Sequence, residues 1–182
     1  MKDKSKLNCL KKEARYTLES KKFLFIILLA LFSCNSSNEV YQAEGVFVNQ
    51  ANVNIGTVEI VQQGDGSNFR IHIDTLKPGS YAMHIHEKGE CAYPDFLTSG
   101  GHHGMKKDGD FYGDFNPIYV KNELSKYTGK LKKFSQTIFL RNIHLDPDSE
   151  FTIMDNNRSS IIIHESVQGG KRIACADLYK KY

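Results

Sequence analysis

The stretch Gly79-Ser-Tyr-Ala-Met-His-Ile-His-Glu-Lys-Gly-Glu-Cys91 is the part of the sequence around which the rest of the chain is organised. In an extended strand alternate side chains share a face, so His84 and His86 point to one side while Met83 and Ile85 pack behind them. Two imidazoles directed at one point suggest a metal site. A strand with two exposed histidines is the alternative for an isolated pair, and the downstream sequence decides between the two interpretations.

Strand-forming segments and Gly-rich turns dominate the remainder of the 182-residue chain, whose length suits one domain. Turn signals such as 63–67 and 76–79 separate short segments of alternating hydrophobicity, which is typical of an all-β antiparallel sandwich or barrel. The segments predicted to be strands are 44–49, 56–62, 68–75, 80–86, 117–120, 134–140, 150–154, 160–164 and 172–178. Residues 87–116 form a loop region rich in Gly, His and Asp, and long loops on a β scaffold tend to carry function.

The N-terminal part predicts export. The apolar run 23–32 follows two lysines and is too short to span a bilayer comfortably, so it reads as the hydrophobic region of a signal peptide. Residues 31–34 resemble a bacterial lipobox, in which Cys34 would receive a lipid; an ordinary signal with an incidental cysteine is the alternative. We therefore expect an N-terminal extension and signal peptide over 1–33, a lipidated tether over 34–43 and a β domain over 44–182. The protein would be extracytoplasmic and anchored to a bacterial membrane, facing the periplasm or the cell surface.

Charge and cysteine content fit an exported domain. After residues 1–33 are removed, 16 basic and 18 acidic residues remain, so nothing favours nucleic-acid binding. Cys9 lies in the removed part and Cys34 would be lipidated, which leaves Cys91 and Cys175 as an even pair in a disulfide-permissive compartment. A bond between them would stabilise the fold by about 4–5 kcal/mol, and two free thiols are the less favoured alternative.

Five motifs, taken in order, make the chain resemble the copper,zinc superoxide dismutase family. They are Thr75-Leu-Lys-Pro-Gly79 leading into His84-Ile-His-Glu87, then Ser99-Gly-Gly-His102, Tyr112-Gly-Asp-Phe115, Ile162-Ile-His-Glu165 and Gly169-Gly-Lys-Arg-Ile-Ala-Cys175. The resemblance implies a Greek-key β-sandwich or barrel of about eight antiparallel strands. It also implies copper ligands at His84, His86, His102 and His164, a residual zinc ligand at Asp114, a disulfide between Cys91 and Cys175, and Arg172 as the catalytic residue that guides the anionic substrate, superoxide.

The residue types suit this chemistry independently of the resemblance. Imidazole nitrogens bind copper, and a near-planar set of four fits Cu(II). An arginine is always charged and offers a planar fork of donors, so Arg172 beside the metal would attract superoxide. His103 is a possible alternative ligand, but it directly follows His102, and on an extended backbone only one of the two can face the metal. The family's spacing favours His102.

The chain departs from the family where zinc would bind. Only eleven residues separate His102 from Asp114, and the one histidine among these eleven is His103. Phe111 occupies the position where the family has a zinc-binding histidine. Only seven residues separate His164 from Arg172, so the long electrostatic loop of the zinc-bearing enzymes is absent. A structural zinc ion requires four ligands, which this segment does not supply. The sequence therefore predicts a copper-only site in which Asp114 orients His102 instead of binding zinc. The predicted activity is superoxide dismutation through Cu(II)/Cu(I) cycling, and an extracytoplasmic copper-binding or copper-buffering protein on the same fold is the alternative.

Overall fold

The computed structural model describes residues 40–124 and 133–182. The predicted signal peptide, the lipid site at Cys34 and most of the tether lie outside these residues. Within the two described ranges, no helix is long and apolar enough to cross a bilayer.

The regular secondary structure of the described domain is almost entirely β-strand, as the sequence predicted. Its one helical element is the single-turn 3-10 helix η1, Leu97–Ser99. The strands are β1 Gln42–Asn49, β2 Asn54–Gln63, β3 Gly66–Ile73, β4 Gly79–Tyr81, β5 Met83–His86, β6 Ile118–Val120, β7 Phe134–Arg141, β8 Ser160–Ser166 and β9 Gly169–Lys180.

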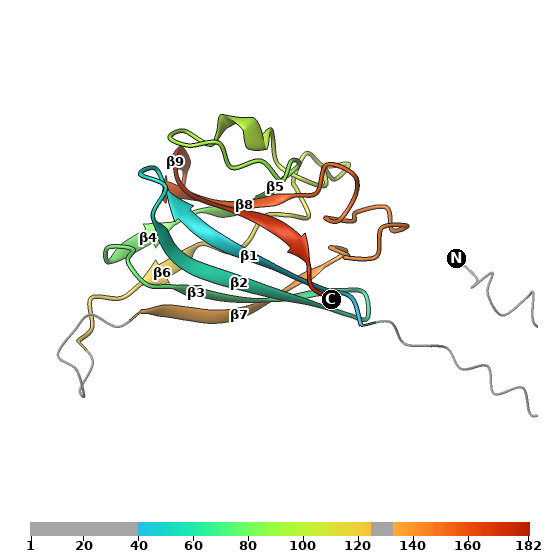
Figure 1. Ribbon diagram of the computed structural model, residues 1–182, viewed down its shortest axis with the longest axis horizontal. Coiled ribbons are helices and arrows are strands. Elements are labelled where there is room, and N and C mark those ends of the chain that lie inside the picture. Colours follow the sequence, from blue (N-terminus) through green and yellow to red (C-terminus); the bar gives the residue numbers. More distant parts are fainter. Residues whose placement is uncertain (1–39, 125–132) are drawn as a thin grey trace, which may run out of the picture. The chain divides into compact units, whose positions relative to one another are not determined.

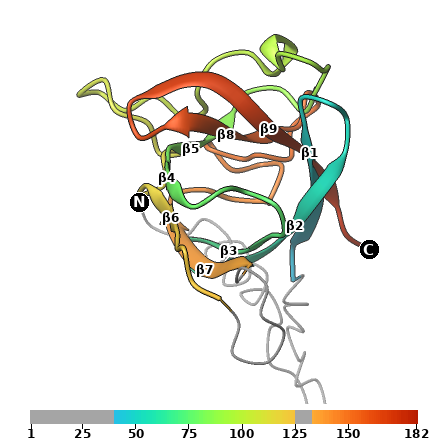
Figure 2. The same ribbon diagram turned by 90° about the vertical axis from the view of Figure 1, so that its left-hand side faces the viewer.

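Seven strands form one curled antiparallel sheet in the order β5-β8-β9-β1-β2-β3-β7, and β4 pairs with β6 in a second, two-stranded sheet. β9 pairs with β1, and β7 pairs with β3, although the strands of each pair are far apart in sequence, and this strand order fits a Greek-key arrangement. Figure 2 shows the small β4–β6 sheet standing at the open side of the curl, between β5 and β7. The loop that connects β5 to β6 passes over β8 and β9 (Figure 1).

The alternation of inward-facing and outward-facing side chains along the strands builds the core. Phe69, Ile71 and Ile73 of β3 and Val58 and Ile60 of β2 are all buried, because every second residue faces the inside of the curl. Full burial of each such side chain contributes roughly 1.5–3 kcal/mol. Phe115, from the β5–β6 loop, meets the ring of Phe69 edge-on at 5.2 Å, so this core also anchors the functional loop.

One predicted strand is in fact two. The segment predicted over 80–86 changes partners at Ala82: Tyr81 pairs with Ile118 in the small sheet, whereas the N–H of Ala82 donates to the carbonyl of Ser166 on β8. The side chains keep alternating between the two faces across this change of partner, so the sequence pattern contains no sign of it. The change of partner is what places β5 beside β8.

The prediction of a strand over 150–154 was wrong. The segment turns instead: the N–H of Thr152 donates to the carbonyl of Ser149, and the hydroxyl of Thr152 accepts from the N–H of Met154. Its apolar pattern has another cause, because Ile153 enters the core while Phe151 packs on the ring of Tyr112 at 4.6 Å. Short polar side chains that bond to nearby backbone favour such turns over strand pairing.

Candidate metal centre

Neighbouring strands β5 and β8 bring three histidines to one face. Because His84 lies opposite Ile162 in the antiparallel register, the alternation puts His84, Ile162 and His164 on the same side. The intervening Met83 and Ile85 are fully buried in the core. The expectation that His84 and His86 share a face with apolar residues behind them is confirmed.

The fourth histidine, His102, comes from the loop, which runs along the free edge of β5. The N–H of His103 donates to the carbonyl of Ile85, and the N–H of Glu87 donates to the carbonyl of Gly101. A second part of the same loop also reaches this edge, where the N–H of Ile85 donates to the carbonyl of Gly113. The loop thus behaves as irregular extra strands, which hold His102 beside His86.

The four imidazoles form a square-like cluster. Centroid distances between adjacent rings run from 4.1 Å for His84–His102 to 5.9 Å for His86–His164. The two remaining pairs, His84–His86 at 6.5 Å and His102–His164 at 6.4 Å, are the diagonals. A tetrahedral set would have six equal separations, so the arrangement is flattened in the way that Cu(II) prefers.

The hydrogen bonds of three of the four rings use Nδ1 and leave Nε2 for a ligand. The Nδ1 atoms of His86 and His164 lie 3.0 Å from the carbonyl oxygens of Gly100 and Gly170, and these carbonyls can only accept, so Nδ1 carries the proton. Their Nε2 atoms, and Nδ1 of His84, are buried and have no partner among the described residues. One candidate ligand atom from each of the four histidines lies within 4.8 Å of the others. Buried nitrogens without partners are costly unless something binds them, so the donor set fits a copper ion.

The electrostatics of the cluster favour metal binding over protonation. Burial, followed by the proximity of His102 and His164, lowers the pKa of His84 to about 3. Burial likewise lowers the pKa of His86 to about 3, and that of His164 falls below its ordinary value for the same reason. These rings are therefore neutral at physiological pH, and neutral imidazole is the form that binds metals.

Arg172 lies beside the cluster. It is the cross-strand partner of His164 at the β8–β9 register shift, and its charge contributes to the lowered pKa of His86. Its guanidinium donates to the carbonyls of Phe96 and Gly100 and to the hydroxyl of Ser99. Sequence reasoning missed these loop acceptors, because backbone carbonyls have no residue signature and appear only when the loop closes over β9.

The disulfide between Cys91 and Cys175 predicted from the sequence is confirmed. It ties the loop to β9, and a second, smaller core lies around it: Phe96 and Ile162 are fully buried against Cys175. The loop over the histidines is therefore anchored at two points, by Phe115 in the main core and by Phe96 in this one.

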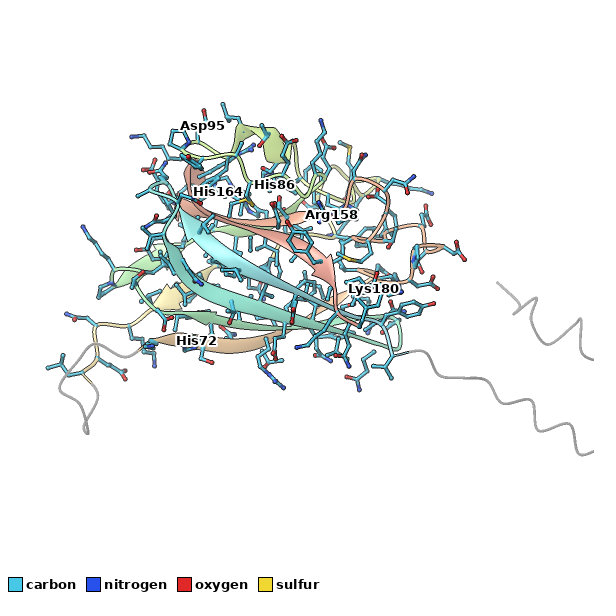
Figure 3. All side chains as sticks on the ribbon, in the orientation of Figure 1. His72, His86, Asp95, Arg158, His164 and Lys180 are labelled. Atoms are coloured by element: carbon cyan, nitrogen blue, oxygen red, sulfur yellow. A yellow bond between two sulfur atoms is a disulfide. The ribbon has the colours of Figure 1, made fainter. Side chains whose placement is uncertain are left out.

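The two other candidate ligands, His103 and Asp114, differ in their position relative to the cluster. His103 is turned away from the cluster, and its ring bonds to the backbone of Phe151. The carboxylate of Asp114 lies 3.0 Å from Nδ1 of His102, and the ring of Phe111 packs against His102 at 5.0 Å. No group of three or more possible ligands within the described ranges includes Asp114. Figure 3 shows His86 and His164 together beneath the loop, with His72 on the opposite side of the domain.

Comparison with known proteins shows similarity over most of this domain. The family model described as copper/zinc superoxide dismutase (SODC) matches residues 54–178. The superoxide dismutase-like protein YojM of Bacillus subtilis (strain 168) is 31% identical over 154 residues, which cover 72% of each chain. The Cu-Zn superoxide dismutase 1 of Aquifex aeolicus (strain VF5) is 26% identical over 163 residues, covering 80% of this chain and 91% of the relative. The crystal structure of a SOD-like protein from Bacillus subtilis matches with a TM-score of 0.62 and 28% identity, over 73% of this chain and 95% of that one.

Proposed function

We propose, from the premise that this chain belongs to the copper/zinc superoxide dismutase family, that it is a copper-dependent superoxide dismutase. The overall reaction converts two superoxide anions and two protons into O₂ and hydrogen peroxide. Copper, when bound, would supply the one-electron cycling between Cu(II) and Cu(I). The observation that carries the proposal is the flattened cluster of His84, His86, His102 and His164 with the cation of Arg172 beside it.

The chain's own groups have separate tasks. Each imidazole presents one nitrogen to the centre, and the carbonyls of Gly100 and Gly170 keep His86 and His164 in the required tautomer and orientation. Arg172 attracts the anion and holds it close to the histidines. The rival function, copper binding without catalysis, needs the histidines but not Arg172, so the presence of Arg172 at this position supports the enzyme.

We propose that the site works without zinc. With Nε2 of His102 directed to the centre, its Nδ1 keeps the proton and donates a hydrogen bond to the carboxylate of Asp114, which takes the place of a second metal. The ring of Phe111 packs edge-on against the same imidazole. Elemental analysis should find copper and no tightly held zinc, and one zinc retained per chain beside copper would overturn this assignment.

We also propose the compartment expected from the sequence, an extracytoplasmic protein held at a bacterial membrane by a lipid on Cys34. A disulfide such as Cys91–Cys175 persists in oxidising compartments, which supports export. Mass spectrometry of the protein extracted from membranes should find a diacylglycerol-modified N-terminal peptide that begins at Cys34. A peptide that contains Cys34 and carries no lipid would refute the anchor.

A superoxide consumption assay on the copper-loaded protein tests the activity. His164→Ala removes one corner of the cluster and should abolish consumption, while the disulfide-bonded fold persists. His72→Ala is the matched control, because His72 is an exposed histidine on the far side of the sheet and should leave activity unchanged. Copper-loaded wild-type protein that binds the metal tightly but consumes no superoxide would favour the buffering function.

A further inference from the structure

The hydroxyl of Ser99 links Arg172 to a histidine of the cluster. Ser99 is fully buried in η1, and its Oγ donates to the carbonyl of Phe96 at 2.8 Å. The same Oγ accepts from Nη1 of Arg172 at 2.9 Å and lies 3.4 Å from Nδ1 of His86. One small side chain thus contacts the guanidinium, the loop and a histidine of the cluster.

The guanidinium of Arg172 has more hydrogen-bond donors than the loop accepts. Arginine has five N–H donors in a fixed plane. Both Nη1 protons are used, one by Phe96 and one by Ser99, and one Nη2 proton goes to the carbonyl of Gly100. Within the described ranges, no hydrogen bond uses Nε–H or the second Nη2–H. Nε–H and the remaining Nη2–H are therefore the donors that the guanidinium still offers to a small oxyanion.

We propose that Ser99 is a positioning residue, which holds the guanidinium of Arg172 so that its Nε–H and its remaining Nη2–H stay free for a small anion. This inference rests on the proposed function, because the anion in question is superoxide. Without the hydroxyl, one Nη1 proton has no acceptor. The guanidinium can then rotate to find another acceptor, and its free donors no longer face the anion. Bonds to a charged group contribute more than neutral ones, so one acceptor is enough to bias the orientation.

A purely structural role for Ser99 can be separated by a matched control. Ser67 on β3 is also fully buried, and its Oγ donates to the carbonyl of Ile143 at 2.8 Å. Ser67→Ala and Ser99→Ala therefore remove equivalent buried hydroxyl-to-carbonyl bonds. Only Ser99→Ala removes an acceptor from Arg172.

The test uses the full chain and two readouts, neither of which is turnover. In ¹⁵N-labelled protein, with and without diamagnetic Cu(I), the Arg172 side-chain N–H signals report rotation of the guanidinium; they are assigned by their loss in Arg172→Lys. Ser99→Ala should broaden or merge them. In Cu(II)-loaded protein, the Kd for azide should rise about 3- to 10-fold, which is the loss of about one hydrogen bond.

The two readouts distinguish a positioning role of Ser99 from a purely structural one. Changes in both readouts in Ser99→Ala but not in Ser67→Ala support the positioning role. Unchanged readouts in Ser99→Ala, or equal changes in both variants, overturn it. If the wild-type protein consumes no superoxide yet the two readouts still separate the variants, the dismutase proposal fails and the positioning of Arg172 stands.

Discussion

Removal of the Asp114 carboxylate should weaken copper binding by way of His102. Nδ1 of His102 and Oδ1 of Asp114 are 3.0 Å apart, and the side chains are 28% and 37% exposed. A hydrogen bond to a charged group contributes about 1.5–3 kcal/mol, and partial exposure places this one near the lower limit. Because 1.4 kcal/mol is a factor of ten, Asp114→Ala should lower copper affinity about tenfold. Asp114→Asn keeps an acceptor without the charge, so its loss should be smaller.

Competition with a chelator of known Cu(II) affinity measures this change. Asp110→Asn is the control, because Asp110 is an exposed carboxylate of the same loop and its substitution should leave the affinity unaltered. The expected order of affinity is wild type and Asp110→Asn, then Asp114→Asn, then Asp114→Ala. If Asp114→Ala binds copper as tightly as wild type, the carboxylate does not orient His102 and the reasoning is refuted.

Two further predictions concern stability. Replacing both Cys91 and Cys175 by Ala removes a crosslink across 84 residues and should lower the free energy of unfolding in urea by about 4.5 kcal/mol, whereas a loss under 1 kcal/mol would contradict the crosslink's stabilising role. Burial raises the pKa of Asp177 above its ordinary 3.8, although Arg158 and the Cys91 backbone act in the opposite direction. The folded state therefore binds this proton more readily than the unfolded state, and its stability falls as the pH rises from 3.8 through the raised value. Asp177→Asn should be more stable than wild type at pH 7 and lose that advantage at pH 3; an equal difference at both pH values would count against the burial argument.

The candidate site was predictable from the sequence in its residue types. Alternation over 83–86 placed two histidines on one face, and the order of motifs identified His102, His164 and Arg172 as their partners. The pairing of Cys91 with Cys175 followed from the count of cysteines in an exported chain and is present in the structure. The shared face of His84 and His86 was predictable because strand periodicity is a local property that a single sequence carries. The choice of His102, His164 and Arg172 came from the family resemblance, and their roles as copper ligands and as the guide for the anion stay predictions.

What the tertiary structure decided depends on contacts between distant segments. The change of partner at Ala82 and the burial of Ile153 in a turn left no local signature. The same holds for the carbonyls of Gly100 and Gly170, which fix two imidazoles, and for Ser99, whose hydroxyl reaches Arg172 across 73 positions. Sequence periodicity shows which face a side chain occupies, but the group opposite it depends on how the sheet curls and how the loop closes. The residue types of the candidate metal site were therefore predictable from the sequence, whereas the orientation of its imidazoles and of its arginine came only from the folded chain.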